Sequence, residues 1–493
     1  MNINENYLTE INKILKNSTE IEQFIEHCQK PLKKSIKINL SRILPEDFIN
    51  LTKQWWWNLT DPWFVGDDKF PIDSFYIDRE NLDTPLGKTF LHLSWFFYIQ
   101  EIAASMPARF LDIKDWDIIL DISAAPGWKS AQISDYLSYL WKNPWFLVSN
   151  EINGKRLQSL AHNLNRMWAF NAWITKFNWF VFGKNLWEVF DSVLVDAPCS
   201  WEWTWYKSDF SLRTWKKQEI NRICGTQFQL LVSAIKSVKA GWNVVYSTCT
   251  MNPYENEENV SKILDFFQWA IELEDINIYW KSSGITSIEE NGEEKQLLSN
   301  LEANKLARFR PHIQKTWWFF VAKFKKIKSL SDRYPVKQSR IYPQNPFKMD
   351  MSKSFQNWVA SYIKDNLGID IDFDKYFFVG TKNKVYITSC KFLEIKDIIQ
   401  FEKVWIPILK FSWQNKLVPL HWLWVVLGDL AQKNFVCLDY EQMQKYSSLK
   451  DIPLSWIKGD FTDREYVIVK YKNWWMSVWK IIDWFLKNKY IKV

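Results

Sequence analysis

The chain has 493 residues, which is enough for two to four domains with a large buried core. Its 63 Lys and Arg residues exceed its 56 Asp and Glu residues by a net charge of +7, a mild basic excess that is compatible with nucleic acid. Six cysteines without CxxC spacing and five histidines without metal-ligand spacing argue against a disulfide scaffold and predict no metal site.

The N-terminal region begins with polar, charged segments that are typical of helices and lack a signal-peptide core. No apolar run reaches the roughly 18 residues that cross a bilayer, so we expect a cytoplasmic protein without a membrane partner. In residues 31–40, lysines interleave with isoleucines as in a half-buried strand, which gives one basic face. That face suits phosphate contact, or equally a solvated sheet edge protected by lysines. Residues 92–106 are typical of a helix that leads into the next domain.

From about residue 116 the pattern strand, loop, helix repeats. The predicted strands are residues 117–123, 145–151, 173–178, 192–200 and 244–246, and the predicted helices between them are 131–141, 155–167 and 226–239. This succession predicts an α/β domain with a doubly wound parallel sheet. Such sheets gather their ligands at the carboxyl ends of the strands.

Chemically useful residues follow the predicted strands. The loop AAPGWKS, residues 124–130, follows the first strand, and Glu151 ends the second. A glycine-containing first loop and an acid after the next strand are how such folds hold an adenosine, because the carboxylate accepts hydrogen bonds from the ribose. The alternative for Glu151 is a plain charge at a helix N-terminus. Asn178 ends the third strand and Asp196 the fourth.

Cys249 lies at the centre of the stretch NVVYSTCTMNPYENE, residues 243–257. Because it directly follows a buried strand, its thiol is placed for chemistry. The alternative is an ordinary small core residue, which is what most free cysteines are. Likewise, Asp196 and Cys199 form either part of a site or merely a turn around Pro198.

The balance of glycine and tryptophan is unusual. Glycine occurs only 13 times and tryptophan 32 times, whereas glycine normally makes up about 7 % of a chain. Five tryptophans stand in turn or loop contexts that disfavour a bulky side chain: Trp128, Trp201, Trp203, Trp205 and Trp242. We hypothesise that the gene uses UGA as a glycine codon and that these codons are written here as Trp. The alternative is a genuinely tryptophan-rich protein.

The composition changes after residue 326. The segment SLSDRYPVKQSRIYPQNPFK carries three prolines and is typical of a linker. The remaining chain has short apolar runs separated by turns, which indicates a small β-rich module, and it ends in a basic segment.

Four stretches, DISAAPGWKS, SNE, DAPCSWEWTW and VVYSTCTMNPYENE, together resemble the RNA cytosine-5 methyltransferases of the two-cysteine type. Flanking segments such as PLKKSIKIN and RFRPHIQKTWWFFVAKF are similar to the branch that acts on small-subunit (16S) ribosomal RNA. The resemblance implies an RNA-binding region at 1–110, a Rossmann-like S-adenosyl-L-methionine (SAM) domain at 111–326, a linker and connecting module at 327–395, and a PUA-like RNA-binding domain at 396–493. A tRNA substrate is the first alternative. A non-catalytic RNA-binding assembly factor is the second, if the loop tryptophans are genuine.

The resemblance also assigns roles to residues. Cys249 would be the nucleophile, Cys199 would assist product release, and Asp196 would interact with N3 of the target cytosine. The cofactor contacts would be Ser123, Ala124, Ala125, Pro126, Gly127, Trp128, Lys129, Glu151, Asn178 and Asp196. A plain surface cation is the alternative for Lys129. The resemblance also implies that the partner is RNA, that the protein is a monomer and that it needs no metal.

The sequence departs from the family pattern in two ways. Tryptophan stands where the family has glycine at Trp95, Trp128, Trp201, Trp203, Trp242 and Trp318. In addition, Asn178 replaces an Asp, and Tyr206 stands where Arg commonly precedes Lys207. An Asn can still accept a hydrogen bond from an adenine amino group, so we expect cofactor binding to persist.

Overall fold

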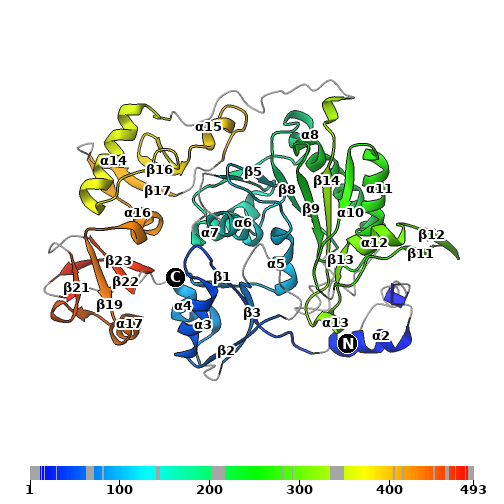
Figure 1. The fold of residues 1–493 in the computed structure, drawn as a ribbon, viewed down its shortest axis with the longest axis horizontal. Helices are drawn as coiled ribbons and strands as arrows, with labels where there is room; N and C mark the ends of the chain where they lie inside the picture. Colours follow the sequence, from blue (N-terminus) through cyan, green and yellow to red (C-terminus); the bar gives the residue numbers. More distant parts are fainter. Residues whose placement is uncertain are drawn as a thin grey trace.

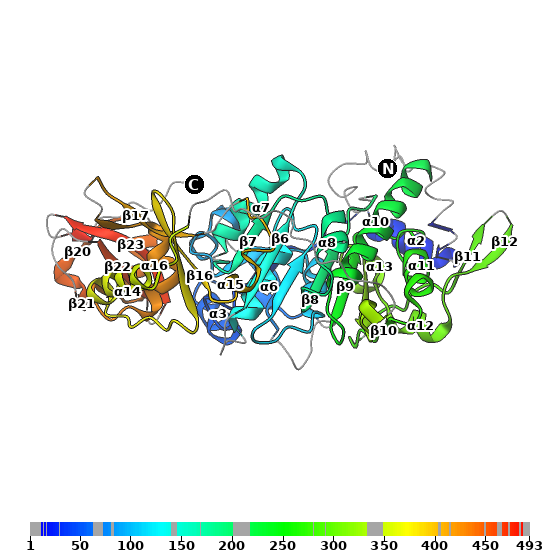
Figure 2. The same ribbon diagram turned by 90° about the horizontal axis from the view of Figure 1, so that it is seen from above.

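The computed structural model describes residues 11–12, 14–15, 17–28, 30–62, 72–79, 83–139, 145–167, 169–200, 217–279, 281–290, 292–332, 349–402, 406–413, 416–447, 450–460, 466–471, 474–482 and 485–486. The chain is elongated, with the C-terminal strands at one end and a central α/β sheet beside them (Figures 1 and 2). Helix α2 (Ser18–Cys28) packs on α13 (Pro311–Gln314) at the other end. No helix among the described residues is long and apolar enough to cross a membrane.

The centre of the molecule is an eight-stranded sheet in the order β10-β14-β9-β8-β5-β6-β7, with β13 paired to β14. Its strands are β5 (Ile118–Asp121), β6 (Phe146–Asn150), β7 (Ala172–Thr175), β8 (Ser192–Asp196), β9 (Asn243–Thr248), β10 (Ile271–Glu274), β13 (Ala307–Phe309) and β14 (Phe319–Lys326). Strands β5 to β9 are parallel, which confirms the predicted doubly wound, Rossmann-like core. Strand β14 pairs antiparallel with β9, and β10 pairs antiparallel with β14 at the edge of the sheet; the sequence analysis missed both strands.

Helices cover both faces of this sheet. They are α5 (Ile102–Arg109), α6 (Trp128–Tyr139), α7 (Gly154–Arg166), α8 (Phe180–Asn185), α10 (Lys217–Ser237), α11 (Glu257–Phe267) and α12 (Asn300–Lys305). Helix α6 packs between α5 and α7, whereas α10 packs against α8 and α11. The hairpin β11 (Ser287–Glu290) and β12 (Glu293–Gln296) projects from the end of the molecule (Figure 2).

The N-terminal region forms a second sheet in the order β2-β3-β1-β4. Its elements are β1 (Ser35–Ile38), α3 (Pro45–Lys53), β2 (Trp57–Thr60), β3 (Ser74–Arg79), α4 (Phe90–Leu93) and β4 (Phe97–Ile99). The prediction of a helix over 92–106 is wrong in its first half, because β4 separates α4 from α5.

Lys37 corrects the expectation of a basic face on residues 31–40. All four residues of β1 are buried, and Lys37 is fully buried. Its ammonium group pairs with Asp73 and lies 3.7 Å from a carboxylate oxygen of Asp135 on α6. Arg109 lies 3.2 Å from the other carboxylate oxygen of Asp73. Because its buried ion pairs connect the N-terminal sheet to helix α6, Lys37 is not available to a phosphate.

The C-terminal part contains two further sheets. Strands β15 (Tyr376–Gly380), β16 (Lys384–Ser389), β17 (Pro407–Phe411) and β18 (Leu417–Pro419) form the first, with α14 (Lys353–Leu367), α15 (Phe392–Ile395) and α16 (His421–Leu427). The second has the order β20-β24-β23-β22-β19-β21, built from β19 (Phe435–Leu438), β20 (Ile452–Pro453), β21 (Lys458–Asp460), β22 (Tyr466–Tyr471), β23 (Trp474–Ile482) and β24 (Phe485–Leu486), with α17 (Tyr440–Ser447). It is rich in β structure, as the sequence indicates, and its assignment to the PUA class stays a prediction.

The two C-terminal sheets dock on different parts of the molecule. The predicted domain boundary at residue 396 falls in the chain between β16 and β17. These two strands pair with each other, so the boundary divides one sheet. The first of these sheets packs on the central sheet, where Trp173 of β7 lies 4.0 Å from Phe392 between ring centroids. The second shares a hydrophobic cluster with the N-terminal sheet, which includes Ile36 and Val436.

Several tryptophans have backbones that suit glycine. Trp56, Trp95 and Trp116 have φ values of +57°, +61° and +71°, a left-handed region that bulky residues rarely adopt. Trp173 and Trp318 are buried, yet the indole N–H of each has no acceptor among the described residues, although a buried indole usually has one. These features support the hypothesis of a glycine codon written as Trp.

We therefore expect UGA at codons 95 and 128 of the gene, and glycine-mass peptides at both positions in protein purified from the source cells. Gly127 is the internal control, because it shares a peptide bond with residue 128 and should be encoded by GGN. A UGG codon or a tryptophan-mass peptide at position 95 would contradict the hypothesis for that residue.

Candidate active site

A cavity of about 530 Å³ opens at the carboxyl ends of β5, β8 and β9, where the sequence places its chemical residues. Its lining comes from the N-terminal region, the loops after three strands, and β14: Ile99, Gln100, Glu101, Ala104, Asp121, Ser123, Ala124, Ala125, Pro126, Trp128, Lys129, Arg156, Asp196, Ala197, Pro198, Cys249, Trp317 and Phe319. The volume lies within the usual range for small-molecule sites.

The two cysteines of the predicted site meet beside this cavity. Cys249 follows β9, and Cys199 follows β8, which is the neighbouring parallel strand. Their Sγ atoms lie 2.9 Å apart. Cys199 is buried, whereas Cys249 is partly exposed and lines the cavity. The thiol that a substrate could reach is therefore that of Cys249, with the Cys199 thiol directly behind it.

Asp196 contacts both the loop Ser123 to Lys129 and strand β9, which precedes Cys249. Its Oδ2 accepts a hydrogen bond from Nζ of Lys129 at 2.7 Å, and its Oδ1 accepts one from Oγ of Ser247 at 2.8 Å. The Lys129 ammonium group also lies 5.2 Å from the ring centroid of Phe319. Lys129 is thus an ion-pair partner inside the cavity, and not the plain surface cation of the alternative interpretation.

The loop from Ser123 to Lys129 is held by helix α7. Arg156 donates to the carbonyl oxygen of Ala125 at 2.6 Å, and Asn163 donates to that of Pro126 at 2.8 Å. Gly127 has φ +108°, and a Cβ there would lie 2.9 Å from Leu160 Cδ1. Only glycine suits this position, because both the backbone conformation and the close helix exclude a side chain.

Trp128 is the first residue of α6 and lines the cavity. Its indole stacks on Tyr98 with 5.5 Å between ring centroids and 8° between planes. The side chain therefore occupies part of the wall that a glycine would leave open, and under the glycine-codon hypothesis the native cavity would be wider at residue 128.

Asp121 ends β5 and offers an acceptor toward the cavity. Its Oδ2 accepts from Ser130, while its Oδ1 is buried and has no hydrogen-bond partner among the described residues. Burial raises the pKa of Asp121 to about 7, with Asp196 nearby adding to the shift. A buried carboxylate oxygen without a donor suits a ligand that brings a cation. The sequence analysis gives Asp121 no role, although it lies in the predicted strand 117–123.

Three predicted cofactor contacts, Gly127, Glu151 and Asn178, lie outside the cavity lining. Glu151 follows β6, where its Oε1 caps the backbone of Asn153 at 2.8 Å. Its Oε2 is buried without a hydrogen bond, 3.4 Å from a guanidinium nitrogen of Arg156. Asn178 is exposed, and its side chain accepts from the backbone of Phe180 at 3.1 Å. Their roles stay predictions, and Glu151 retains an acceptor for a ribose whereas Asn178 caps its own turn.

A buried polar network positions the loop that carries Cys199, and the sequence analysis missed it. Oε2 of Glu255 accepts from the backbone N–H of Ser200 at 3.0 Å and from Nε2 of Gln227 at 2.8 Å. The same Gln227 nitrogen donates to the carbonyl oxygen of Pro198. The side-chain oxygen of Gln227, Oε1, accepts from Nδ2 of Asn259 at 2.9 Å. The sequence feature that could have revealed this network is the position of Glu255 six residues after Cys249, within the same stretch NVVYSTCTMNPYENE.

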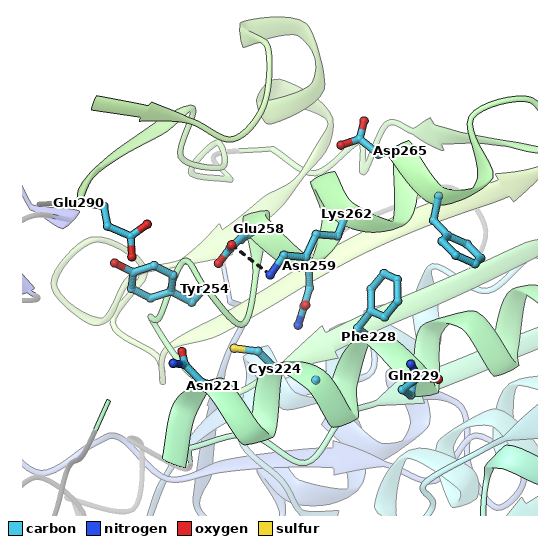
Figure 3. Close-up of a pocket in the computed structure, with 12 residues that line it drawn as sticks. Asn221, Cys224, Phe228, Gln229, Tyr254, Glu258, Asn259, Lys262, Asp265 and Glu290 are labelled. Atoms are coloured by element: carbon cyan, nitrogen blue, oxygen red, sulfur yellow. Dashed lines mark ion pairs between the residues drawn. The ribbon is translucent and has the colours of Figure 1, made fainter. Parts of the chain in front are cut away.

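Behind this network, α10 and α11 enclose a second hollow of about 670 Å³ (Figure 3). It is lined by Cys224, Phe228 and Tyr254 among others, and an ion pair of Glu258 with Lys262 crosses its rim at 3.0 Å. Burial raises the pKa of the Cys224 thiol to about 12, so this cysteine is not a nucleophile at neutral pH. None of the predicted site residues lines this hollow.

Trp201, Trp203, Trp205, Tyr206 and Lys207 lie outside the described residues. Within the described ranges, no group of three or more His, Cys, Asp or Glu side chains could hold a metal ion.

Comparison with known proteins identifies relatives of the whole chain. A family model described as 16S rRNA methyltransferase RsmB/F matches residues 108–325. The ribosomal RNA small subunit methyltransferase F of Vibrio atlanticus is 30 % identical over 99 % of this chain and 96 % of its own length. That of Shewanella oneidensis is 29 % identical over 92 % of this chain and 89 % of its own length.

Solved structures agree in fold. A methyltransferase homologue from Pyrococcus horikoshii has a TM-score of 0.53 at 25 % identity, covering 64 % of this chain and 93 % of its own. NSun6 from Pyrococcus horikoshii, solved with SFG, has a TM-score of 0.52 at 20 % identity, covering 65 % of this chain and 97 % of its own. The similarity covers the methyltransferase fold and less than the full chain.

Proposed function

The chain belongs to the family of ribosomal RNA small subunit methyltransferase F, and from this membership we propose that it methylates C5 of a cytosine in 16S ribosomal RNA with SAM as the methyl donor. The main support is the pair of thiols, Cys199 and Cys249, with 2.9 Å between their Sγ atoms and Asp196 nearby. One thiolate is enough to attack a pyrimidine at C6, and the second thiol beside it could move a proton when the nucleophile leaves.

The cavity fits the cofactor on its own chemistry. The loop Ser123 to Lys129 and Glu151 would hold it, and the unpaired Oδ1 of Asp121 would face one of its positive charges. When bound, SAM supplies an electrophilic methyl group. Asn178, exposed on its loop, would reach the adenine from outside the described cavity lining.

Catalysis would begin at Cys249. Carbon 5 of cytosine is a weak nucleophile, and addition of a thiolate at C6 moves electron density to C5. The S–C6 bond forms as the π electrons of the C5–C6 bond move into the ring, and Asp196 would deliver a proton to N3, so that no net negative charge builds up on the base. Ser247 and Lys129 orient the Asp196 carboxylate, so this group is fixed before the base arrives.

Release would require Cys199. After methylation, the proton on C5 must leave, the electron pair of the C5–H bond forms the C5–C6 double bond, and the S–C6 bond to Cys249 breaks. Cys199 has its thiol against that of Cys249 and would move a proton in this step. The Glu255 network holds the loop in place and would keep the two sulfurs together.

The RNA partner must present an unstacked base, because the cavity is enclosed by protein on several sides. Unstacking costs a few kcal/mol, which favours loops or distorted helices. We further propose that the N-terminal region and the C-terminal β-rich sheet bind the RNA, and that the protein acts in the cytoplasm as a monomer without a metal.

The direct test is bisulfite sequencing of ribosomal and transfer RNA from cells with and without the gene. We expect one cytosine of 16S ribosomal RNA to lose its protection in the deletion strain and regain it on complementation. Loss confined to a tRNA would identify the alternative substrate, and no change in either RNA would contradict the proposal.

The pKa of Asp121 makes cofactor binding depend on pH. Between pH 8 and pH 6 the carboxyl group passes through its pKa of about 7 and becomes mostly protonated. Only the charged form attracts a cation, so we expect the dissociation constant of SAM to rise about tenfold from pH 8 to pH 6. Calorimetric titration measures this change. Asp121→Asn should bind more weakly at pH 8 with little further change at pH 6, and a wild-type affinity that does not change would exclude this role.

A further inference from the structure

Gln100 is the cavity residue that neither the predicted site nor the proposed mechanism uses. It lies between β4 and α5, is 8 % exposed, and lines the same cavity as Cys249 and Asp196. Its Oε1 is buried and has no hydrogen-bond donor among the described residues. A buried amide oxygen normally has a partner, so this one indicates a ligand.

The orientation of the Gln100 amide is determined by its nitrogen. Nε2 donates to the carbonyl oxygen of Ala104 at 3.3 Å, one turn along α5. The reverse assignment would place Oε1 against that carbonyl oxygen, where two acceptors repel. The oxygen is therefore the atom that remains for a ligand.

The backbone around Gln100 is fixed from two sides. Ser35 donates through Oγ to the carbonyl oxygen of Gln100 at 2.8 Å. The next residue, Glu101, caps α5 by accepting from the backbone of Ala104 at 3.1 Å and accepts from the backbone of Trp317 at 3.2 Å. Gln100 thus presents its oxygen from a rigid position, as a recognition residue must.

The other charged or polar groups of the cavity already have partners or roles. Asp196 is held by Lys129 and Ser247, and Arg156 by the loop carbonyl of Ala125. Oδ1 of Asp121 would take the cofactor. The oxygen of Gln100 remains, on the wall that also contains the aromatic rings of Trp317 and Phe319. Aromatic rings are surfaces on which unstacked bases rest.

The chemistry of the base then limits the contact. In a cytosine attached through N1, both O2 and N3 are acceptors, and the 4-amino group is the donor of the ring. Resting on the proposed function, we propose that Oε1 of Gln100 accepts a hydrogen bond from the 4-amino group of the target cytosine and thereby rejects uracil. Uracil carries an oxygen at that position, and two facing acceptors cannot pair.

The test compares two RNAs, a 16S ribosomal RNA transcript with the mapped target cytosine and the same transcript with uridine there. The value of kcat/KM for methyl transfer is measured with each RNA, for the wild type and for Gln100→Leu, which keeps the size and removes the acceptor. We expect Gln100→Leu to lower kcat/KM on the cytosine RNA by about 10- to 100-fold and to leave the uridine RNA within about threefold.

A matched control is Gln132→Leu, the same substitution at a fully buried residue of α6 outside the cavity. Gln132 donates to the Ser105 carbonyl oxygen and to the Tyr136 hydroxyl, so its loss should lower Tm without changing the ratio of kcat/KM for the two RNAs. If Gln100→Leu does not fold, Gln100→Asn, with the acceptor withdrawn by one methylene, gives the same comparison.

Two results would overturn the proposal. One is an equal loss on both RNAs with Gln100→Leu, which would indicate a structural role. The other is an increased dissociation constant for SAM with an unchanged ratio, which would assign the oxygen to the cofactor. A wild-type enzyme that methylates neither RNA would instead refute the proposed function itself.

Discussion

Cys249→Ala eliminates methyl transfer to 16S ribosomal RNA while SAM still binds with an affinity within about twofold of the wild type. We expect this result because the thiol of Cys249 is the sulfur that reaches the cavity, whereas the predicted cofactor loop lies on a different strand end. Loss of a covalent nucleophile lowers kcat by roughly 10⁴-fold or more. Tritiated methyl transfer and calorimetric titration measure the two quantities.

The matched control for this substitution is Cys390→Ala. Cys390 is partly buried and donates to the carbonyl oxygen of Asp374, far from the cavity in the sheet of β15 to β18. Its removal should leave kcat near the wild-type value. Turnover by Cys249→Ala above a few per cent of wild type would show that another group attacks the base.

Cys199→Ala should accumulate a covalent complex of the protein with its RNA. The substitution leaves Cys249 free to attack, but removes the thiol that lies 2.9 Å from it and would assist its departure. Denaturing electrophoresis would show a band of reduced mobility that collapses on RNase treatment. The double variant Cys199→Ala, Cys249→Ala should form no such band, because the attacking sulfur is then missing.

The outcome also separates two roles for Cys199. If the single variant turns over normally and no adduct accumulates, Cys199 is a packing residue behind the nucleophile. If it loses activity without an adduct, it contributes to attack rather than to release. Only activity loss together with an adduct supports the assignment to release.

The parallel core was predictable because each of its strands is a short apolar run followed by a polar loop. Strand β8 is fully buried up to Val195 and ends at Asp196, so the position of the carboxylate follows from the pattern. Strands β10 and β14 were not predictable in this way. Strand β14 carries lysines such as Lys323 and Lys325, and its pairing with β9 is set by tertiary contacts.

The N-terminal errors have a common physical cause. A lysine inside a strand usually indicates solvent, but Lys37 is neutralised by two acids from distant segments, Asp73 and Asp135. Local patterns carry no information about such partners. For the same reason the apolar residues 92–106 resembled one helix, although a left-handed residue at Trp95 precedes a strand.

At the site, the positions of the reactive residues were predictable, whereas the hydrogen bonds that hold them in place were not. Cys249 and Asp196 follow from strand ends, and the structure brings both to one cavity with Lys129. Glu255 and Gln100 act through hydrogen bonds that join segments far apart in the chain, so no local pattern reveals their contacts. The roles of all these residues in catalysis stay predictions until the substitutions are measured.

The buried ion pairs between Lys37, Asp73 and Asp135 have a consequence for how the protein selects its target. Removing one member of such a group costs about 3–5 kcal/mol, because the remaining charge is left without a partner. The N-terminal sheet is therefore held in a fixed position against the methyltransferase domain and does not move independently of it. An RNA segment bound by that sheet would lie at a fixed distance from the thiol of Cys249. A fixed span of this kind selects one cytosine by its position in a folded RNA, even where neighbouring cytosines have the same sequence context.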